Sequence, residues 1–416
     1  MCEVLSADKG LSVVSPPRKL DDRARLRLIV VCEYWPSRTN PISGVFLVQQ
    51  VAAILTKASF VTVIVPKIVG KPQEYCSVAE LGLDEARVVV IEVLTARIPG
   101  SLAFMPGFLR LNAIFSGLAV AFKLREISRV EDINGCLVHD SRYASLSLPF
   151  WRRFVRGKVV TVMHGVDPYF GSVRRRRSAK SQFRQLGGLT DFVALVGSPL
   201  RGYATSLGLP EKKMRVVANG TDLPPRAVAS DGQRPSSARR RIVSVCNLNE
   251  IKGIDDNLLA LRALSTRRPD LAWEYRVVGD GAQRESLESL SVSLGLSDRV
   301  TFVGRIPYLE TMSEISDCDI FCLASWGEAF GIVYLEAMAR MRPVIGCLEN
   351  GPADFITSGH DGLLVPPRST AALAEALECL IEDPGKCQRL GREARNTAEK
   401  FSWDTNAELM LDLLAD

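Results

Sequence analysis

The sequence predicts an α/β protein made of two doubly wound domains whose parallel sheets face one another across a cleft. Three observations support this prediction. The 416 residues are enough for two or three domains, and a composition of 47% hydrophobic and 24% charged residues is ordinary for a globular protein. Short, continuous runs of Val, Ile and Leu alternate with stretches of helical periodicity, as in βαβ units. These runs form two series, separated by one segment without periodicity.

The first domain is expected at residues 26–223, after a polar leader at residues 1–25 that has no apolar core of the kind found in secretory signals. The apolar run at 26–32 is followed by a loop rich in Pro, Ser and Asn, then by a helix that begins near residue 45 and by a strand at 60–66. This order is that of a βαβ unit. Further buried strands are expected at 88–94, 136–140, 158–165, 192–197 and 214–220.

The segment at 224–240, PPRAVASDGQRPSSARR, has no periodicity and is interpreted as a linker. The second domain is assigned to residues 241–400. Its strands are expected at 241–248, 273–280, 299–304, 319–324, 342–347 and 362–367. Residues 401–416 are predicted to form an amphipathic helix that closes the chain and packs back on the first domain. Because open parallel sheets bind ligands beyond the carboxyl ends of their strands, the site is expected between the two sheets.

The net charge of +5 has a local origin in the first domain. Between Trp151 and Arg215 there are 14 Lys and Arg residues but only three acidic residues. This region is interpreted either as a solvated basic face or as a surface that attracts an anionic membrane or a phosphate-bearing substrate. So mild a net excess does not by itself indicate nucleic acid as a partner.

The cysteines and histidines argue against a disulfide framework and against a zinc site. The ten cysteines form no CxxC pair, and the chain has only three histidines. Reduced, mostly buried thiols are typical of a cytoplasmic protein. The longest apolar segment, 109–122, is interrupted by Asn112 and is shorter than the ~20 residues that cross a bilayer. We therefore expect a cytoplasmic protein that is at most peripheral on the inner face of the membrane.

Two carboxylates stand in apolar surroundings in the segment SWGEAFGIVYLEAM, residues 325–338. Glu328 lies in a loop after an expected strand, and Glu336 lies in the helix that follows. Along a helix they would be roughly 12 Å apart, too far to share a proton but suited to hydroxyl groups at two ends of one ligand. Gly331 and the free amides of the first helical turn suit a phosphate between them. The alternative is one acid that complements the helix dipole and one surface glutamate.

Three further candidates lie at the end of an expected strand or in the loop that follows one. Lys252 precedes a glycine after the strand at 241–248, where a lysine can meet a phosphate, although Lys-Gly turns are also common without a ligand. His164 ends the strand at 158–165 and is either a ligand contact or a structural histidine. Gly44 follows the first strand and either lets an amide approach a ligand or forms a turn. With no Walker loop, no GxGxxG and no Ser-His-Asp set, the pattern favours a sugar nucleotide.

The same motifs occur, in the same order, in a known enzyme family. EAFGIVYLE, with two glutamates separated by seven residues, resembles the signature of the retaining glycosyltransferases of family 4, which have the GT-B fold. The resemblance covers most of the chain, through NPISGVFLVQQVAAI, VVTVMHGVD, ANGTDL, CNLNEIKG, FVGRI, NGPADFITSGHDGLLVPP and FSW. The first loop is similar to that of members that build exopolysaccharide or teichuronic-acid-type polymers.

The resemblance implies a role for each matching residue. Lys252 would neutralise the leaving diphosphate, Glu328 would bind hydroxyl groups of the donor sugar, and His164 would lie over the transferred sugar. These three are the expected catalytic residues. Members of the family need no metal in the active site, so neither a metal nor a cofactor is expected beside the donor, a UDP- or GDP-sugar. The expected substrate-binding residues are Glu336 at the ribose, Gly44 at the diphosphate and acceptor edge, Arg305 and Ile306 at the base, the main chain of Ala329, Phe330, Gly331 and Ile332, and Asn247 before the lysine turn.

The chain departs from the family pattern in two places. The family often has Gly-Arg before the lysine turn, where this chain has Cys246 and Asn247. One basic side chain that would contact the phosphate is therefore absent or is supplied elsewhere, for example by the basic stretch of the first domain. Losing such a contact would cost ~1.5–3 kcal/mol. Asp354 stands where a glutamate is usual, and this change is expected to be tolerated.

The expected function is transfer of a hexose, with retained anomeric configuration, from a nucleotide-diphosphate sugar to a hydroxyl of a glycan or lipid-linked acceptor in exopolysaccharide or cell-surface polysaccharide synthesis. The expected partners are the nucleotide sugar, this acceptor and an anionic membrane surface. The alternatives are a GT-B sugar-nucleotide epimerase and a weakly active paralogue that serves as a partner subunit. A nucleic-acid-binding protein would leave the cleft motifs unexplained.

Overall fold

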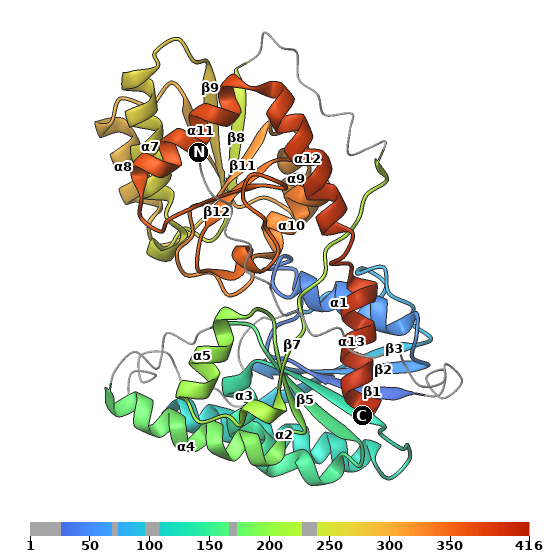
Figure 1. The fold of residues 1–416 in the computed structure, drawn as a ribbon. Coiled ribbons are helices and arrows are strands. Elements are labelled where there is room, and N and C mark those ends of the chain that lie inside the picture. The colour runs from blue at the N-terminus through green and yellow to red at the C-terminus, as the bar shows by residue number, and fades with distance from the viewer. Residues whose placement is uncertain (1–25, 69–73, 96–107, 166–172, 227–238, 416) are drawn as a thin grey trace.

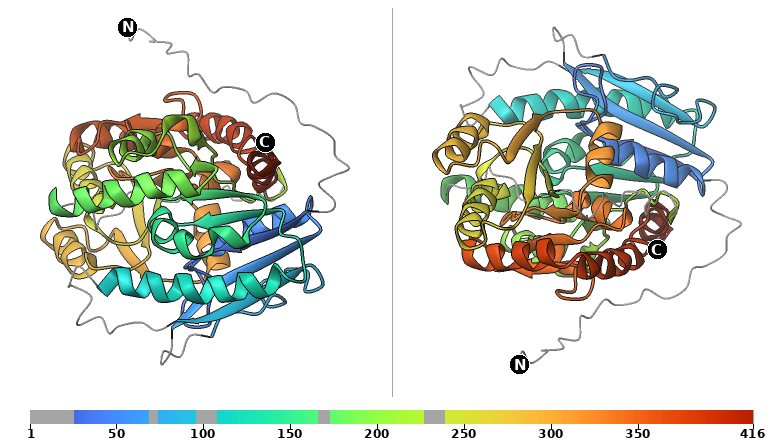
Figure 2. Two further views of the ribbon diagram at one scale, coloured as in Figure 1. Left: turned by 90° about the horizontal axis from the view of Figure 1, so that it is seen from below. Right: turned by 90° about the horizontal axis from the view of Figure 1, so that it is seen from above.

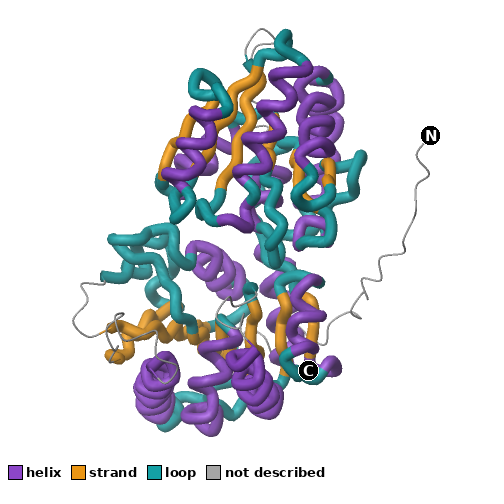
Figure 3. Tube along the Cα trace, turned by 90° about the vertical axis from the view of Figure 1, so that its left-hand side faces the viewer, coloured by secondary structure: helices purple, strands orange, loops and turns teal. Residues whose placement is uncertain are grey.

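The computed structural model describes residues 26–68, 74–95, 108–165, 173–226 and 239–415, which form two α/β domains (Figure 1). The leader expected at 1–25 and residues 227–238 of the expected linker lie outside the described residues. Viewed from the side, each domain has a layer of strands with helices packed on it (Figure 3).

The first domain is built on a parallel sheet of seven strands in the order β3-β2-β1-β4-β5-β6-β7. Its central strands are buried almost throughout, and β4 is buried at every residue. A strand covered on both faces requires a continuous apolar run, which is the pattern seen in the sequence. The strands are β1 (Arg27–Val31), β2 (Phe60–Ile68), β3 (Val88–Thr95), β4 (Gly135–His139), β5 (Lys158–Met163), β6 (Phe192–Leu195) and β7 (Met214–Val216).

The second domain has a parallel sheet of six strands in the order β10-β9-β8-β11-β12-β13. Buried positions are again nearly continuous in the central β11 and β12. The strands are β8 (Arg240–Val245), β9 (Trp273–Val278), β10 (Val300–Gly304), β11 (Ile320–Cys322), β12 (Val344–Cys347) and β13 (Leu363–Val365). Every strand expected from the sequence is present in the two sheets.

The helices of the first domain include one from the far end of the chain. Helix α13 (Trp403–Ala415) lies against α1 (Val45–Leu55), where Gln50 Nε2 donates to Asn406 Oδ1 at 2.7 Å and Lys57 forms an ion pair with Glu408 at 3.0 Å. Figure 1 shows α13 beside this domain, at the red end of the chain. The remaining helices are α2 (Phe108–Ile127), α3 (Ser141–Trp151), α4 (Val173–Leu189), α5 (Pro199–Ser206) and the 3-10 turns η3 (Arg152–Phe154) and η5 (Glu211–Lys213).

Helix α2 contains the apolar segment noted at 109–122. None of the helices in the described part of the chain combines the length and the apolar character that a membrane span needs. In the second domain the helices are α7 (Ile254–Arg267), α8 (Arg284–Ser293), α9 (Tyr308–Ser316), α10 (Ile332–Ala339), α11 (Thr370–Glu382), α12 (Pro384–Ala398) and the 3-10 turns η6 (Glu250–Lys252) and η7 (Gly351–Asp354).

The domains touch through segments that follow the carboxyl ends of their strands. Asp354, in η7 after β12, accepts hydrogen bonds from the Ser198 amide at 2.6 Å and from the Ser198 hydroxyl at 2.5 Å. Next to this contact, a Cβ on Gly197 would lie 2.1 Å from the carbonyl oxygen of Ala329, so the two backbones meet where only glycine fits. The carboxyl ends of the two sheets therefore face each other. Figure 2 shows the two domains from below and from above.

Candidate functional site

The carboxyl ends of β1, β4 and β5, which are neighbours in the first sheet, bring Gly44 and His164 together. Gly44 begins α1 in the left-handed conformation, with φ of 78°. A Cβ there would lie 3.1 Å from the carbonyl oxygen of Tyr34, so both the backbone angle and the space favour glycine. Two residues later, Phe46 places its ring edge-on to the His164 imidazole, with centroids 4.9 Å apart. His164 therefore lies at the N-terminal end of α1.

His164 has a histidine neighbour that was not expected from the sequence. Its Nε2 lies 2.8 Å from Nδ1 of His139, and the two ring planes are 15° apart, with centroids 5.1 Å apart. Burial, only partly opposed by Asp140, lowers the pKa of His164 to about 4. Burial and the neighbouring His164 hold the pKa of His139 well below its usual value, so both imidazoles are neutral at pH 7. A signal was available, because His139 lies near the end of the expected strand at 136–140 and adjacent parallel strands end side by side.

The turn after β4 is held by Asp140. This residue has φ of 75°, which is uncommon outside glycine. Its Oδ1 accepts from the amides of Arg142 at 2.9 Å and Tyr143 at 3.0 Å, which caps α3, and its Oδ2 accepts from the Tyr34 hydroxyl at 2.6 Å. Burial and Asp140 raise the pKa of Tyr34, so its hydroxyl stays a donor. The position of His139 is therefore fixed by the residue that follows it.

In the second domain, Lys252 and Glu328 form an ion pair with each other. Lys252 Nζ lies 2.6 Å from Glu328 Oε2, and the side chains are only 18% and 16% exposed. The loop after β11 is tied to η6, because the Trp326 amide and the Ser325 hydroxyl each donate to the carbonyl of Ile251 at 3.0 Å. A ligand that binds Lys252 would therefore also release Glu328 from its present partner.

The loop that leads into α10 presents main-chain amides beside this ion pair. None of the amides of residues 329–332 donates a hydrogen bond to another described residue. Gly331 begins the helix with φ of 92°. The Phe330 side chain is buried against Phe355, with ring centroids 5.2 Å apart, so Phe330 can offer a ligand only its main chain. Unpaired amides at a helix N-terminus suit an anionic group.

Glu336 is buried on α10, so the alternative that it is a surface glutamate is wrong. The Tyr308 hydroxyl donates to Glu336 Oε1 at 3.1 Å. Burial raises the pKa of Glu336 to about 7, and the hydrogen bond from Tyr308 and the charge of Arg340 oppose this shift only in part. A carboxylate that is shielded from water requires additional hydrogen-bond donors, and the hydroxyl groups of a ligand can supply them.

Glu336 belongs to a hydrogen-bond network that joins the two domains. Gln49 of α1 donates to Asp222 at 2.5 Å and to the Tyr308 hydroxyl at 3.2 Å, and Tyr308 in turn donates to Glu336. Gln49, Asp222 and Tyr308 were not predicted as site residues. Gln49 and Tyr308 are 259 positions apart in the chain, so no local pattern could connect them.

The remaining candidates lie at the carboxyl ends of β8 and β10. Asn247 is exposed two residues after β8 ends, and Arg305 is exposed directly after β10. Ile306 is half-buried beside it. The side chains of residues 174–177, which include the arginine run of the basic stretch, lie outside the described residues. The structure thus brings the second-domain candidates to the same edge of the sheet.

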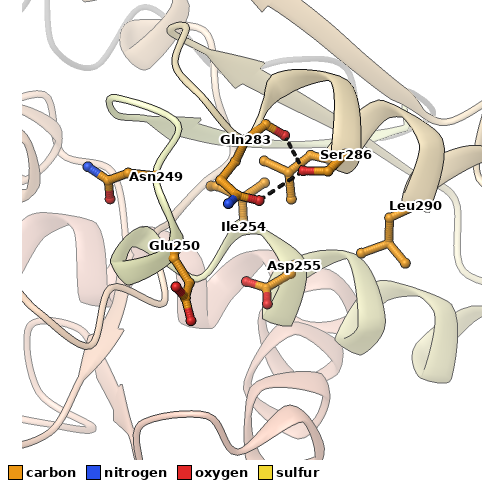
Figure 4. Close-up of a pocket in the computed structure, with 8 residues that line it drawn as sticks. Asn249, Glu250, Ile254, Asp255, Gln283, Ser286 and Leu290 are labelled. Carbon is orange, nitrogen blue, oxygen red and sulfur yellow. Dashed lines mark hydrogen bonds between the residues drawn. The ribbon is translucent and has the colours of Figure 1, made fainter.

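A separate pocket of about 270 Å³ lies beside this site, between the loop after β8 and helices α7 and α8 (Figure 4). Ile254, Leu287 and Leu290 supply its apolar wall, and Glu250 and Asp255 supply an acidic one. It contains none of the predicted site residues. An acidic lining also disfavours a diphosphate, so this pocket is not the site described above.

The described cysteines are all free thiols. Within the ranges that the structure describes, no group of three or more His, Cys, Asp or Glu side chains is arranged to hold a metal ion.

Comparison with known sequences finds similarity that centres on the second domain. Residues 229–397 match the family model "Glycosyl transferases group 1". The chain is 28% identical over 266 residues to the "Putative colanic acid biosynthesis glycosyltransferase WcaL" of Escherichia coli (strain K12), which covers 62% of this chain and 63% of that protein. It is 31% identical over 215 residues to the D-inositol 3-phosphate glycosyltransferase of Rhodococcus jostii (strain RHA1). This match covers 49% of this chain and 48% of that protein. The chain thus spans about half to just under two thirds of the length of these relatives.

Comparison with solved structures identifies the fold. The structure of Anabaena HepE in complex with UDP and glucose has a TM-score of 0.69 to this chain at 17% identity, over 94% of this chain and 100% of that one. The fold expected from the sequence, GT-B with two Rossmann-like domains, is confirmed. Residues 229–397, which match the group 1 glycosyl transferase model, lie in the second domain of this fold.

Proposed function

We propose that this chain, whose second domain is of the group 1 glycosyl transferase family within a GT-B fold, is a metal-independent, retaining hexosyltransferase of family 4 in polysaccharide synthesis. The donor is a nucleotide-diphosphate sugar, and the acceptor is a hydroxyl of a glycan or lipid-linked saccharide. The names of the sequence relatives support the reaction class, and the UDP and glucose held by HepE support the donor class.

One observation carries the proposal: a cation is paired with a carboxylate that directly precedes a segment whose amides donate to no other described residue. Lys252 and Glu328 lie 2.6 Å apart beside the free amides of residues 329–332. A diphosphate needs the cation and the amides, and a sugar needs the carboxylate. A nucleotide sugar carries both groups side by side, so a single ligand can occupy all of these contacts.

The proposed reaction breaks the bond between the anomeric carbon and the diphosphate oxygen. The acceptor oxygen forms a new bond to that carbon on the same face, the electron pair of the broken bond stays on the diphosphate, and the acceptor proton is released. Lys252 and the amides of residues 329–332 stabilise the charge that develops on the diphosphate. Glu328 holds sugar hydroxyls, Glu336 holds the ribose, and His164 contacts the transferred sugar. Gly44 lets the main chain approach the ligand closely where the diphosphate meets the acceptor. Arg305 and Ile306 contact the base.

A panel of UDP-, GDP- and ADP-sugars should identify the donor. In thermal unfolding, one donor is expected to stabilise the protein by about 2.7 kcal/mol at a hundredfold excess over its Kd. Mass spectrometry should then show product only when an acceptor saccharide is added. Conversion of the donor without an acceptor would instead indicate the epimerase. Stabilisation without transfer to any acceptor would indicate the weakly active partner subunit, for which the exposed Asn247 is the supporting observation.

We also propose that the acceptor is lipid-linked and reached at an anionic membrane surface. On α2, Phe115, Leu118 and Phe122 are 41%, 39% and 72% exposed and follow one another at helical spacing. Helices α2, α3 and α4 pack side by side on the face turned away from the second domain (Figure 2). Exposed Lys180 and Arg184 of α4 add positive charge to that layer. Apolar and basic side chains on one face are typical of peripheral membrane binding.

Flotation with vesicles of phosphatidylcholine and phosphatidylglycerol tests this surface. Binding is expected at low salt and release at high salt, because the attraction to anionic lipid is screened. The Phe122→Ser variant should bind roughly tenfold more weakly, since a buried aromatic side chain contributes about 1.5–3 kcal/mol. Val292→Ser, which removes a 67% exposed apolar side chain from α8 of the second domain, is the matched control. Equal flotation of both variants, or no binding by the unmodified protein, would refute the surface.

A further inference from the structure

His139 is a buried titratable side chain that the proposed reaction does not use. It is fully buried at the end of β4, and its Nδ1 is 2.8 Å from Nε2 of His164. Its other nitrogen, Nε2, has no hydrogen-bond partner among the described residues. A buried imidazole with one nitrogen engaged and the other unpaired constrains where its proton can lie.

Two arrangements of the protons satisfy the contact between the rings. In the first, His164 donates from Nε2, and neutral His139 must then carry its own proton on Nε2, where the buried N–H meets no described acceptor. In the second, His139 donates from Nδ1, and its Nε2 is a bare lone pair. Buried N–H groups without a partner are rarer than acceptors without one, so the second arrangement is favoured. In it, Nε2 of His164 accepts and the remaining proton of His164 lies on Nδ1.

The packing around the pair keeps the rings in this relation. The imidazole planes are 15° apart, and Phe46 lies edge-on to His164 at 60°. Asp140, directly after His139, is held by two amides of α3 and by the Tyr34 hydroxyl. A 180° turn of either ring would break the 2.8 Å contact that joins them. The arrangement therefore belongs to the resting protein and does not require a ligand.

We propose that His139 is a positioning residue that holds His164 in its Nδ1–H form, so that His164 meets the substrate as a hydrogen-bond donor and not as a base. The inference rests on the proposed function only in the identity of the substrate. It restricts the group opposite His164 to an acceptor oxygen, such as a sugar hydroxyl or a diphosphate oxygen. Proton removal from the acceptor hydroxyl is accordingly assigned elsewhere.

Nitrogen NMR of protein labelled with ¹⁵N-histidine tests this directly. The chain has only three histidines, and the 62% exposed side chain of His360 supplies a reference signal from the protein surface. In the unliganded protein at pH 7, both His139 and His164 are expected to carry their proton on Nδ1. A proton on Nε2 of His164 would overturn the proposal. Because no donor is present, this measurement stands even if the protein transfers no sugar, so the two proposals can fail separately.

Two substitutions separate positioning from packing. His139→Phe keeps a ring but removes the donor, and His139→Asn keeps an N–H near the former Nδ1. The Phe variant should lose the fixed Nδ1–H signal of His164 and lower kcat roughly ten- to a hundredfold with little change in KM for the donor. The Asn variant should recover much of the Nδ1–H signal of His164 and much of the lost kcat. Equal spectra and equal kcat for all three proteins would overturn the positioning role. If the Phe variant does not fold, the nitrogen signals of the unmodified protein decide.

Discussion

Replacement of Lys252 by methionine is expected to lower kcat/KM for sugar transfer roughly a hundred- to a thousandfold, because the charge that meets the leaving diphosphate is lost. Among the candidate residues of the second-domain site, Lys252 is the cation placed beside the free amides of residues 329–332. Asn247, at the position where the resemblance predicts a second cation, is neutral. Initial rates with the donor identified by the panel measure the effect.

Because Lys252 pairs with Glu328, the Lys252→Met substitution should also change the stability of the protein without substrate. Lys252→Met leaves Glu328 only 16% exposed and without its partner, which should cost about 1–3 kcal/mol of unfolding free energy. The double variant K252M/E328Q removes the unpaired charge and should recover most of that stability while remaining inactive. Lys57→Met, which breaks the ion pair with Glu408 on the first domain, is the matched control and should transfer normally. An active Lys252→Met protein would contradict the diphosphate role.

The fold was predictable because its strands are buried on both faces. The runs LRLIVVC and FVTVIVP are apolar except for Arg27 and Thr62, because strands inside a covered parallel sheet are buried on both faces, and this pattern identifies β1 and β2 without a structure. The ends of the strands were less well predicted. The strand expected at 158–165 ends at Met163 in β5, and His164 lies just beyond it. Polar residues that follow a strand satisfy no periodicity.

The candidate site was predictable only where its residues share one segment. Glu328, Gly331 and Glu336 stand in a single loop and helix, so the sequence shows them together. Tyr308 and Gln49 contact the same network from different domains, and no local pattern records such a contact. The ion pair between Lys252 and Glu328 could not be inferred either. The resemblance assigns Lys252 to the diphosphate and Glu328 to the sugar, and it says nothing of a contact between them when no ligand is bound.

Replacement of Glu336 by glutamine is expected to stabilise the unliganded protein at high pH while lowering its affinity for nucleotide. Burial raises the pKa of Glu336 to about 7 from 4.5 in the unfolded chain. The folded state therefore holds this proton more tightly, and the associated stability is full below pH 4.5 and lost as the pH rises through 7. The loss amounts to about 3 kcal/mol. Glutamine does not titrate, so E336Q and the unmodified protein should have similar stability at pH 5 and differ by about this amount at pH 8.

The cost of ionised Glu336 is what a ribose would relieve. Two ribose hydroxyls can donate to the carboxylate, each worth about 1.5–3 kcal/mol as a charge-assisted hydrogen bond, so nucleotide affinity should rise with pH through 7 and fall roughly a hundredfold or more in E336Q. Chemical denaturation at pH 5 and 8, with and without nucleoside diphosphate, measures both effects. Glu310→Gln, an exposed carboxylate on the same helix as Tyr308, should change neither. Parallel stability curves for E336Q and the unmodified protein would show that the carboxyl is not strained, and an unchanged response to nucleotide would exclude Glu336 from the ribose contact.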